Sequence, residues 1–258
     1  MADEVLYEIL EAGIALVTLN RPEKMNAVSP ALAEALDAAV KRSEADPQVT
    51  VVILTSSNDR AFCAGADLEA VTRGEGPRLS TVDGGFAGFV YAKREKPWIA
   101  AVRGSAVAGG MEISIACDMT VAAEDAKFGL PEPKRGLLAG AGGVTRLSRT
   151  IPRRIAVEMV ATGDSIDARR AYEVGLVNRV VPVDQLMPEA LALARRIAAN
   201  APLAVRWAVK LAREADVLDD ESARKRTEEA IAVLRVTEDW KEGPRAFVEK
   251  RPPVWQGR

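Results

Sequence analysis

Apolar positions change their spacing along the first 50 or so residues, and the changes predict strands followed by a helix. Residues 5–9 and 14–19 are extended apolar runs, which predicts two strands joined by a turn. Ser29 is a suitable helix N-cap, with Pro30 at the first helical position. Apolar residues then recur at helical spacing and predict one buried face, made by Leu32, Ala35, Leu36, Ala39 and Val40. The helix is expected to end at Asp46-Pro47.

The middle of the chain alternates between buried strands and glycine-rich segments. Residues 49–55 are almost continuously apolar, as in a strand that is covered on both faces. Further strands are expected at 98–102 and 119–123. Repeated glycines between 56 and 96 break any regular spacing, so this part is expected to form loops with short helices.

Helical spacing dominates beyond about Pro152, which makes the expected fold class α/β. The expected helices cover 186–197, 205–212 and about 220–236. No low-complexity linker separates the strand-rich and helical parts, so we expect one continuous unit. Within it we distinguish a core at 1–195, which carries the site, from a helical region at 196–258.

Charge and cysteine content narrow the range of partners. The 258 residues include 35 Lys and Arg against 37 Asp and Glu, a net charge of −2. This balance gives no bulk attraction to nucleic acid or to an acidic membrane surface, and neither is an expected partner. Cys63 and Cys117 make no disulfide framework and fit no zinc pattern. Together with an acidic start, Met1-Ala2-Asp3-Glu4, that lacks the apolar region of a signal peptide, this predicts a cytoplasmic protein.

The absence of histidine restricts the possible catalytic mechanisms more than any other feature of the composition. It excludes Ser-His-Asp and Cys-His hydrolysis, and it excludes His-ligated metals, so no metal is expected. Proton transfer near neutral pH must then use Asp, Glu, Lys, Tyr or Cys. A carboxylate with a shifted pKa is the favoured group.

The first candidate segment is Ala61-Phe62-Cys63-Ala64-Gly65-Ala66-Asp67-Leu68, which follows the strand at 49–55. Small residues at 64–66 let a ligand approach the backbone closely, and free N–H groups at a strand-to-helix turn bind partial negative charge. The competing interpretation is a small-residue loop that packs beneath a neighbouring element.

The second candidate segment is Gly104-Ser105-Ala106-Val107-Ala108-Gly109-Gly110-Met111-Glu112, which leads from a strand into an apolar helix. Glycines at a helix start expose N–H groups at the positive end of the helix dipole, where an oxyanion is stabilised. Glu112 lies in the first turn, close to that position. Alternatively, its carboxylate only complements the dipole.

The third candidate segment is Phe128-Gly129-Leu130-Pro131-Glu132, followed by the glycine cluster at 140–143. Glu132 is a second candidate acid, or else a surface carboxylate paired with Lys134 or Arg135. The glycine cluster is expected to open another helix. It is no dinucleotide fingerprint, because the third glycine would fall at Thr145.

Taken together, these segments resemble the signature of the enoyl-CoA hydratase (crotonase) family. The most specific part is Gly-Gly-x-Glu at 109–112 with Phe-x-x-Pro-Glu at 128–132. Weaker matches follow in order along the chain, at 20–27, 96–102, 162–163, 175–177 and 242–251. The resemblance implies a crotonase-like spiral of strand-strand-helix (ββα) units with a C-terminal helical trimerisation region. It also implies a homotrimer, or a hexamer of two trimers.

The resemblance further implies an acyl-CoA thioester substrate and no separate cofactor, since coenzyme A is part of the substrate. The thioester carbonyl would bind the N–H groups of Ala66 and Gly109. Glu112 and Glu132 correspond to the two glutamates of hydratase members. The CoA contacts implied in the same chain are backbone contacts from Lys24, Met25, Ala27, Ala64, Ala66, Asp67 and Leu68, with Gly109 also at the substrate. Phe247 and Lys250 would reach the CoA of a neighbouring subunit.

The chemistry of hydration fits these groups. Two N–H donors stabilise the enolate oxygen that develops as water attacks C3, one carboxylate takes a proton from water, and one carboxylic acid protonates C2. We assign mainly the first carboxylate role to Glu112 and the second to Glu132. The expected reaction is therefore enoyl-CoA hydration. The alternatives are carnitinyl-CoA dehydration, which the sequence at 242–257 also resembles, double-bond isomerisation, and a non-catalytic acyl-CoA-binding protein.

Two positions depart from the pattern of many family members. Glu69 stands where a lysine is common, which puts one phosphate contact in doubt. Ala139 stands where proline is common, and this difference is expected to reshape the acyl pocket.

Overall fold

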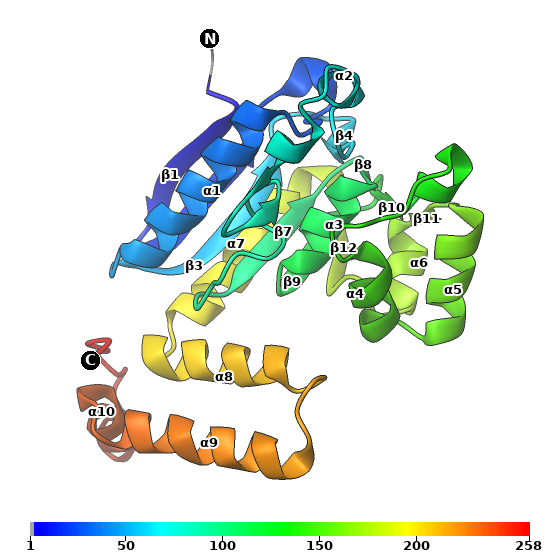
Figure 1. Ribbon diagram of the computed structural model, residues 1–258. Coiled ribbons are helices and arrows are strands. Elements are labelled where there is room, and N and C mark those ends of the chain that lie inside the picture. Colours follow the sequence, from blue (N-terminus) through cyan, green and yellow to red (C-terminus); the bar gives the residue numbers. More distant parts are fainter. Residues whose placement is uncertain (1–2) are drawn as a thin grey trace.

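The computed structural model describes residues 3–258 (Figure 1), so Met1 and Ala2 of the N-terminal sequence lie outside the described residues. The largest sheet has the strand order β1 (Val5–Glu11), β2 (Gly13–Leu19), β3 (Val49–Ser56), β7 (Trp98–Val102), β9 (Met119–Ala123) and β12 (Arg179–Val181). A smaller sheet has the order β11 (Ile166–Asp167), β10 (Lys127–Gly129), β8 (Ser105–Val107) and β4 (Ala61–Cys63). A short ladder pairs β5 (Ser80–Thr81) with β6 (Gly85–Phe86).

The helices confirm the expected α/β class. The first half contains α1 (Pro30–Ala45), α2 (Leu68–Thr72), α3 (Gly109–Ala116), α4 (Gly143–Thr150), and the 3-10 turns η1 (Pro22–Lys24), η2 (Gly76–Leu79) and η3 (Glu132–Arg135). The second half contains α5 (Arg153–Thr162), α6 (Ala168–Glu173), η4 (Val183–Gln185), α7 (Leu186–Ala198), α8 (Pro202–Glu214), α9 (Asp220–Arg235) and α10 (Glu238–Val248). Ser29 caps α1 as expected, because its side-chain oxygen accepts from the Leu32 N–H.

The chain winds between the two larger sheets as a spiral. Strand β3 lies in the large sheet and β4 in the small one, and the pairs β7/β8 and β9/β10 repeat this arrangement. Corresponding strands pair in parallel, β3–β7–β9 in one sheet and β4–β8–β10 in the other. The carboxyl ends of β4, β8 and β10 therefore lie at one edge. This is where parallel sheets place their ligands, and each of the three candidate segments continues past the carboxyl end of one of these strands.

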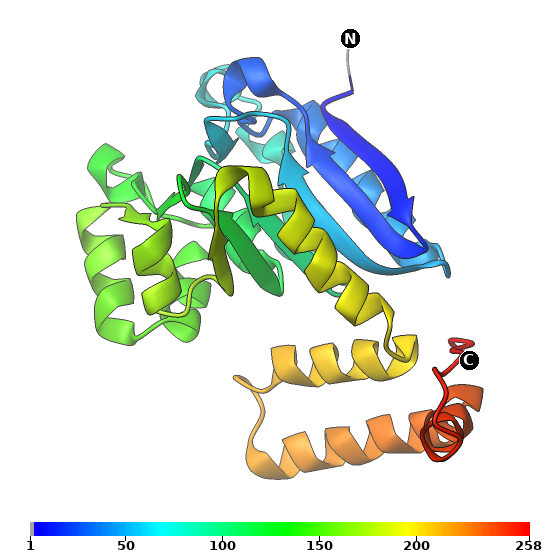
Figure 2. The ribbon, with the colours of Figure 1, turned by 180° about the vertical axis from the view of Figure 1, so that it is seen from behind.

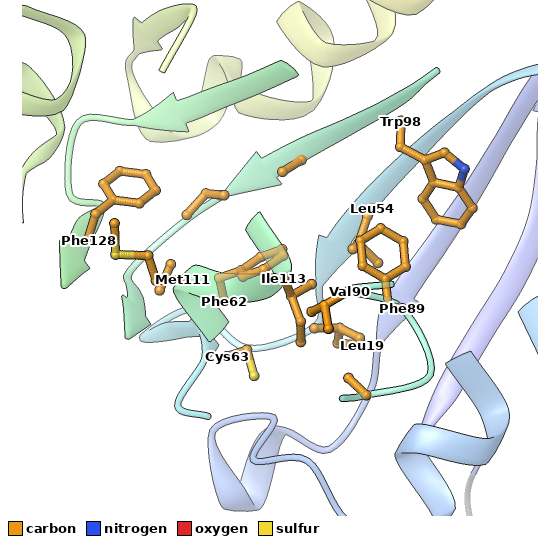
Figure 3. Close-up of a cluster of buried hydrophobic side chains, with 14 of the residues drawn as sticks. Leu19, Leu54, Phe62, Cys63, Phe89, Val90, Trp98, Met111, Ile113 and Phe128 are labelled. Carbon is orange, nitrogen blue, oxygen red and sulfur yellow. The ribbon is translucent and has the colours of Figure 1, made fainter. Parts of the chain in front are cut away.

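Two apolar layers cover the large sheet, because side chains alternate between its faces. On β2, Ala15, Val17 and Leu19 belong to the layer that includes α1, whereas Ile14 and Leu16 belong to the layer under α7. Figure 2 shows α7 crossing the face of the sheet opposite α1. Figure 3 shows part of the larger layer, in which the Phe89 and Trp98 rings meet edge to face with centroids 5.1 Å apart. The continuous apolar strand at 49–56 is buried between these two layers.

A buried lysine, Lys96, donates hydrogen bonds at the C-terminal end of α1. Lys96 is only 1% exposed, and its Nζ donates to the backbone oxygens of Ser43 and Asp46, at 2.5 and 2.6 Å. These carbonyls lie at the C-terminal end of the helix, where the dipole is negative and backbone acceptors lack helical partners. The side chain therefore supplies both a charge and two hydrogen bonds to the helix end.

Lys96→Met should lower the free energy of unfolding by about 2 kcal/mol, because it leaves buried acceptors at a helix end without donors. Urea denaturation at fixed protein concentration measures the loss. Lys93→Met is the matched control, since Lys93 is exposed and close in sequence, and it should change stability by less than about 0.5 kcal/mol. Equal effects of the two substitutions would contradict this role for Lys96.

Helices α8, α9 and α10 stand apart from the sheets in both ribbon views (Figures 1 and 2). Arg213 of α8 ties them to the core through its Nε, which donates to Asp118 Oδ1 at 2.6 Å. Large apolar side chains remain exposed here, among them Val236 and Phe247. The predicted boundary between 195 and 196 falls within α7, so the division into two parts stays a prediction. Within residues 3–258 no helix has the length and apolarity needed to cross a bilayer.

Candidate active site

A cavity of about 640 Å³ opens at the carboxyl ends of β4, β8 and β10. All three candidate segments line it, with Ala64, Ala66, Leu68, Val107, Ala108, Gly109, Glu112, Pro131 and Glu132. The rest of the wall comes from Ser80, Gly85, Phe86, Tyr91, Arg135, Leu137, Leu138, Gly140 and Ala141. The structure thus brings together the four residues predicted to act on the thioester: Ala66, Gly109, Glu112 and Glu132.

Two backbone N–H groups at this cavity have no acceptor within residues 3–258. Val28 forms an isolated bridge beside Ala66, in which the Val28 N–H donates to Gly65 O at 2.7 Å and its carbonyl accepts from the Asp67 N–H at 3.0 Å. The bridge leaves the Ala66 N–H unused. Gly109 is the first residue of α3, so its N–H has no partner within the helix. Both groups are available to a carbonyl oxygen.

Glycines allow α3 to approach the turn after β4. A Cβ atom on Gly110 would lie 1.9 Å from the Cys63 backbone oxygen, and one on Gly65 would lie 2.8 Å from Ala108 Cβ. No side chain fits either gap without moving backbone. The small residues of both segments therefore have a packing cause, which confirms the competing interpretation of the first segment. The same packing brings the two N–H groups to one wall of the cavity, and anion binding there stays a prediction.

Glu112 is fixed in a buried position. It lies in the first turn of α3, is 4% exposed, and its Oε1 accepts from the Gly143 N–H at 2.8 Å. Burial raises the pKa of Glu112, the charge of Glu132 raises it further, and the Gly143 hydrogen bond opposes the rise. A carboxyl group with a raised pKa is suited to proton transfer near neutral pH.

Glu132 reaches the same cavity from the start of η3. Burial raises its pKa, and its Oε2 is buried without a hydrogen-bond partner among the described residues. No ion pair joins Glu132 to Lys134 or Arg135 in residues 3–258, and Lys134 pairs with Asp164 instead. The alternative of a surface carboxylate in an ion pair is therefore wrong. A buried acceptor beside a cavity calls for a partner from the ligand or from water.

Glu112→Gln should stabilise the fold at pH 8 and lose this advantage toward pH 5. The folded-state pKa of Glu112 is raised, so its ionised form costs stability above that pKa, and the cost disappears as pH falls toward the unfolded value of about 4.3. Glutamine keeps an oxygen for the Gly143 N–H. We expect a rise of at least about 2 °C in the thermal midpoint at pH 8, measured by calorimetry. A rise that does not shrink with falling pH would contradict this charge effect.

The side chains of some residues whose backbone is expected to contact CoA have partners of their own. The Asp67 carboxylate caps α2 and forms an ion pair with Arg21 at 2.7 Å, so its side chain is structural. Lys24 Nζ forms an ion pair with Glu69 Oε1 at 2.9 Å. Glu69 is the residue that stands where many family members have a lysine. Met25 lies beside the first segment, because its carbonyl accepts from the Ala64 N–H at 3.1 Å. CoA contacts at these positions, and at Ala27, Ala64 and Leu68, stay predictions.

Phe247 and Lys250 are not among the residues that line the cavity. Phe247 is on α10, the helix that Figure 1 shows apart from the sheets, and its side chain is 85% exposed. Contact with the CoA of a neighbouring subunit stays a prediction for both residues.

Three side chains near the cavity were not predicted. Phe86 packs against Gly109, where an added Cβ would lie 2.4 Å from its ring. Tyr91 carries the Arg146 guanidinium over its ring, 4.8 Å from the centroid. Arg146 also donates to the Ala141 and Val90 carbonyls, which joins the glycine cluster to the loop that bears Tyr91. Phe86 and Tyr91 come from the irregular stretch at 56–96, whose sequence gives no periodic signal.

Comparison with known proteins agrees with this arrangement. Residues 10–258 match the family model described as enoyl-CoA hydratase/isomerase. The carnitinyl-CoA dehydratase of Salmonella typhi is 39% identical over 261 residues, 99% of each chain. An enoyl-CoA hydratase structure from Mycobacterium tuberculosis H37Rv is 41% identical with a TM-score of 0.94, covering 99% of this chain and 100% of that one. A carnitinyl-CoA hydratase structure from Mycobacterium avium is 42% identical with a TM-score of 0.77, and both chains are covered completely. The chain therefore belongs to the enoyl-CoA hydratase/isomerase family and has its crotonase-like fold.

Proposed function

We propose that this protein is a hydro-lyase that adds water reversibly across the C2=C3 bond of a 2-enoyl-CoA. One observation supports this most directly. Two carboxyl groups with raised pKa values, Glu112 buried and Glu132 half-buried, line the same cavity as two backbone N–H groups that have no acceptor among residues 3–258. Hydration needs these two kinds of group together, because it moves two protons and develops charge on one oxygen.

The N–H groups of Ala66 and Gly109 would hold the thioester oxygen. As water attacks C3, the electrons of the double bond shift through C2 toward this oxygen, which becomes an enolate. The donors are fixed by the Val28 bridge and by the start of α3, so they need no reorganisation as charge develops. One such donor typically changes turnover by about 10²–10³-fold.

The two glutamates would carry the protons. The Glu112 carboxylate takes a proton from the attacking water, whose oxygen bonds to C3. The Glu132 carboxylic acid gives a proton to C2 as the enolate collapses, and the product is a 3-hydroxyacyl-CoA. Each turnover leaves Glu112 protonated and Glu132 ionised, so a proton returns between them before the next cycle. Apparent pKa values of activity then belong to the pair.

The first segment would guide the rest of the substrate. Ala64 and Leu68 line the cavity on the side of the loop at 24–27, where we place the CoA moiety. We also propose that the exposed apolar side chains of α9 and α10, such as Val233, Val236 and Phe247, pack against other copies of the chain in a trimer or hexamer. Sedimentation measures the assembly state.

Carnitinyl-CoA dehydration is the second candidate. The Salmonella and Mycobacterium avium relatives that carry this activity in their names are 39% and 42% identical over nearly the whole chain. The same two carboxylates and two N–H groups serve either reaction, because both form or break a C–O bond at C3. The acyl group alone distinguishes them.

The test is turnover on 2-enoyl-CoA substrates of increasing chain length, with crotonobetainyl-CoA included. Loss of the conjugated enoyl thioester absorbance follows the reaction. Hydration of the plain substrates supports the proposal, whereas acyl-CoA binding without hydration of any chain length would identify a binding protein instead.

A further inference from the structure

We infer that Arg135 makes the acyl end of the cavity selective by charge. By acyl end we mean the wall formed by Tyr91, Arg135, Leu137, Leu138 and Ala141. The wall would accept 2-enoyl groups that are uncharged or end in a carboxylate, and it would disfavour those that end in a quaternary ammonium. The inference rests on the proposed function, which places the thioester at Ala66 and Gly109 and the CoA beyond Ala64, and so directs the acyl group to this wall.

A quaternary ammonium is normally held by the open face of an aromatic ring. Phe86 and Tyr91 are the aromatic side chains among the lining residues. The Arg146 guanidinium already lies over the Tyr91 ring. The Phe86 ring lies against Gly109, whose N–H is assigned to the thioester oxygen. The lining residues therefore form no aromatic cage around the position of an acyl terminus.

A carboxylate is the other group that would hold a cation. Glu112 and Glu132 are the acidic residues that line the cavity, and both are assigned to the reacting carbons. The wall beyond them offers no acidic side chain within the described residues.

Arg135 places a positive charge on the acyl end of the cavity. Its neighbour Lys134 is held by Asp164, with Nζ 2.5 Å from Oδ1. The exposed Arg135 forms no ion pair within 4.0 Å in residues 3–258, and its charge acts on Glu132, where it opposes the rise in the pKa of that carboxyl group. An unpaired guanidinium beside an apolar surface repels a cation and attracts a carboxylate, bidentately where the geometry allows. Leu137 and Leu138 are 56% and 73% exposed, so the rest of this wall suits an uncharged chain.

Calorimetry with saturated, unreactive ligands tests the inference without turnover. We expect wild-type protein to bind butyryl-CoA at least about tenfold more tightly than 4-trimethylammoniobutyryl-CoA, and glutaryl-CoA at least as tightly as butyryl-CoA. Arg135→Gln should reduce the first ratio by about threefold or more, and Arg135→Glu should reduce it further. Lys134→Gln is the matched control, since it removes one positive charge from a side chain that does not line the cavity, and it should leave the ratio unchanged.

The outcomes separate this inference from the proposed reaction. Equal binding of the neutral and cationic ligands by wild-type protein would overturn the inference. The inference would also be overturned if Arg135→Gln left the affinity ratio of the neutral to the cationic ligand unchanged, or if Lys134→Gln changed that ratio equally. Binding of glutaryl-CoA tenfold weaker than that of butyryl-CoA would overturn it as well. Charge selectivity in binding without hydration of crotonyl-CoA would instead contradict the proposed hydratase activity alone.

Discussion

Glu132→Gln should lower the hydration rate of crotonyl-CoA by about 10³-fold while acyl-CoA binding stays within a few-fold of wild type. The substitution keeps the shape and polarity of the side chain but removes the proton that we assign to C2. Its Oε2 has no partner in the described residues, so an amide nitrogen in its place removes no acceptor from another residue. Steady-state kinetics with calorimetry on butyryl-CoA measures both quantities.

Glu158→Gln is the matched control for this result, since Glu158 is exposed on α5 and is not a lining residue. It should leave turnover unchanged. Near-normal hydration by Glu132→Gln would remove Glu132 from the mechanism. A parallel loss of acyl-CoA binding would show that the residue positions the substrate, without a role in proton transfer.

The second large effect is expected from removal of the Gly109 N–H. A proline there lacks the donor, and the first residue of a helix tolerates proline. Its Cβ would nevertheless lie 2.4 Å from the Phe86 ring and 3.2 Å from Gly65 Cα, so the test is made in a Phe86→Ala background that removes the closer contact. In that background Gly109→Pro should hydrate about 10²–10³-fold more slowly than Gly109→Ala, which keeps the N–H.

Turnover and thermal unfolding are measured together for these variants. Gly76→Ala is a further control, because its added Cβ would have no neighbour closer than 4.0 Å. The oxyanion role lacks support if Gly109→Pro and Gly109→Ala hydrate at the same rate. It also lacks support if the loss of activity only follows the loss of folded protein.

Local signals in the sequence were sufficient for the framework of the fold. The Ser29 cap and the buried run at 49–55 depend on residues close in sequence, and both are confirmed. The stripe on α1 is confirmed except at Ala35, which is half-buried, while Ala33 is buried instead. The two glutamates and the glycine turns also carried local signals. The two glutamates and the glycine turns meet at one cavity because β4, β8 and β10 lie side by side in parallel. In the sequence, only the resemblance to a family implied this arrangement.

Other features depend on contacts between distant segments and had no local signal. The hydrogen bond that holds Glu112 comes from Gly143 on another helix, and the ring that packs against Gly109 comes from an irregular loop. The resemblance implied a backbone contact to CoA at Asp67 and gave no role to its carboxylate. Its ion pair with Arg21 joins residues 46 positions apart, which no spacing rule reveals.

The Val28 bridge has a consequence for how remote parts of a substrate affect the rate. The loop at 24–28 supports the turn that presents the Ala66 donor, and we place the nucleotide half of the substrate on that loop. Binding of the nucleotide would then restrict the motion of the Ala66 N–H. Binding energy from a part of the substrate far from the double bond would in this way increase the rate of hydration. An enoyl thioester of pantetheine, which lacks the nucleotide, would then show a low turnover rate even at saturating concentration. The nucleotide of CoA would therefore contribute to catalysis by holding the active site in its productive geometry.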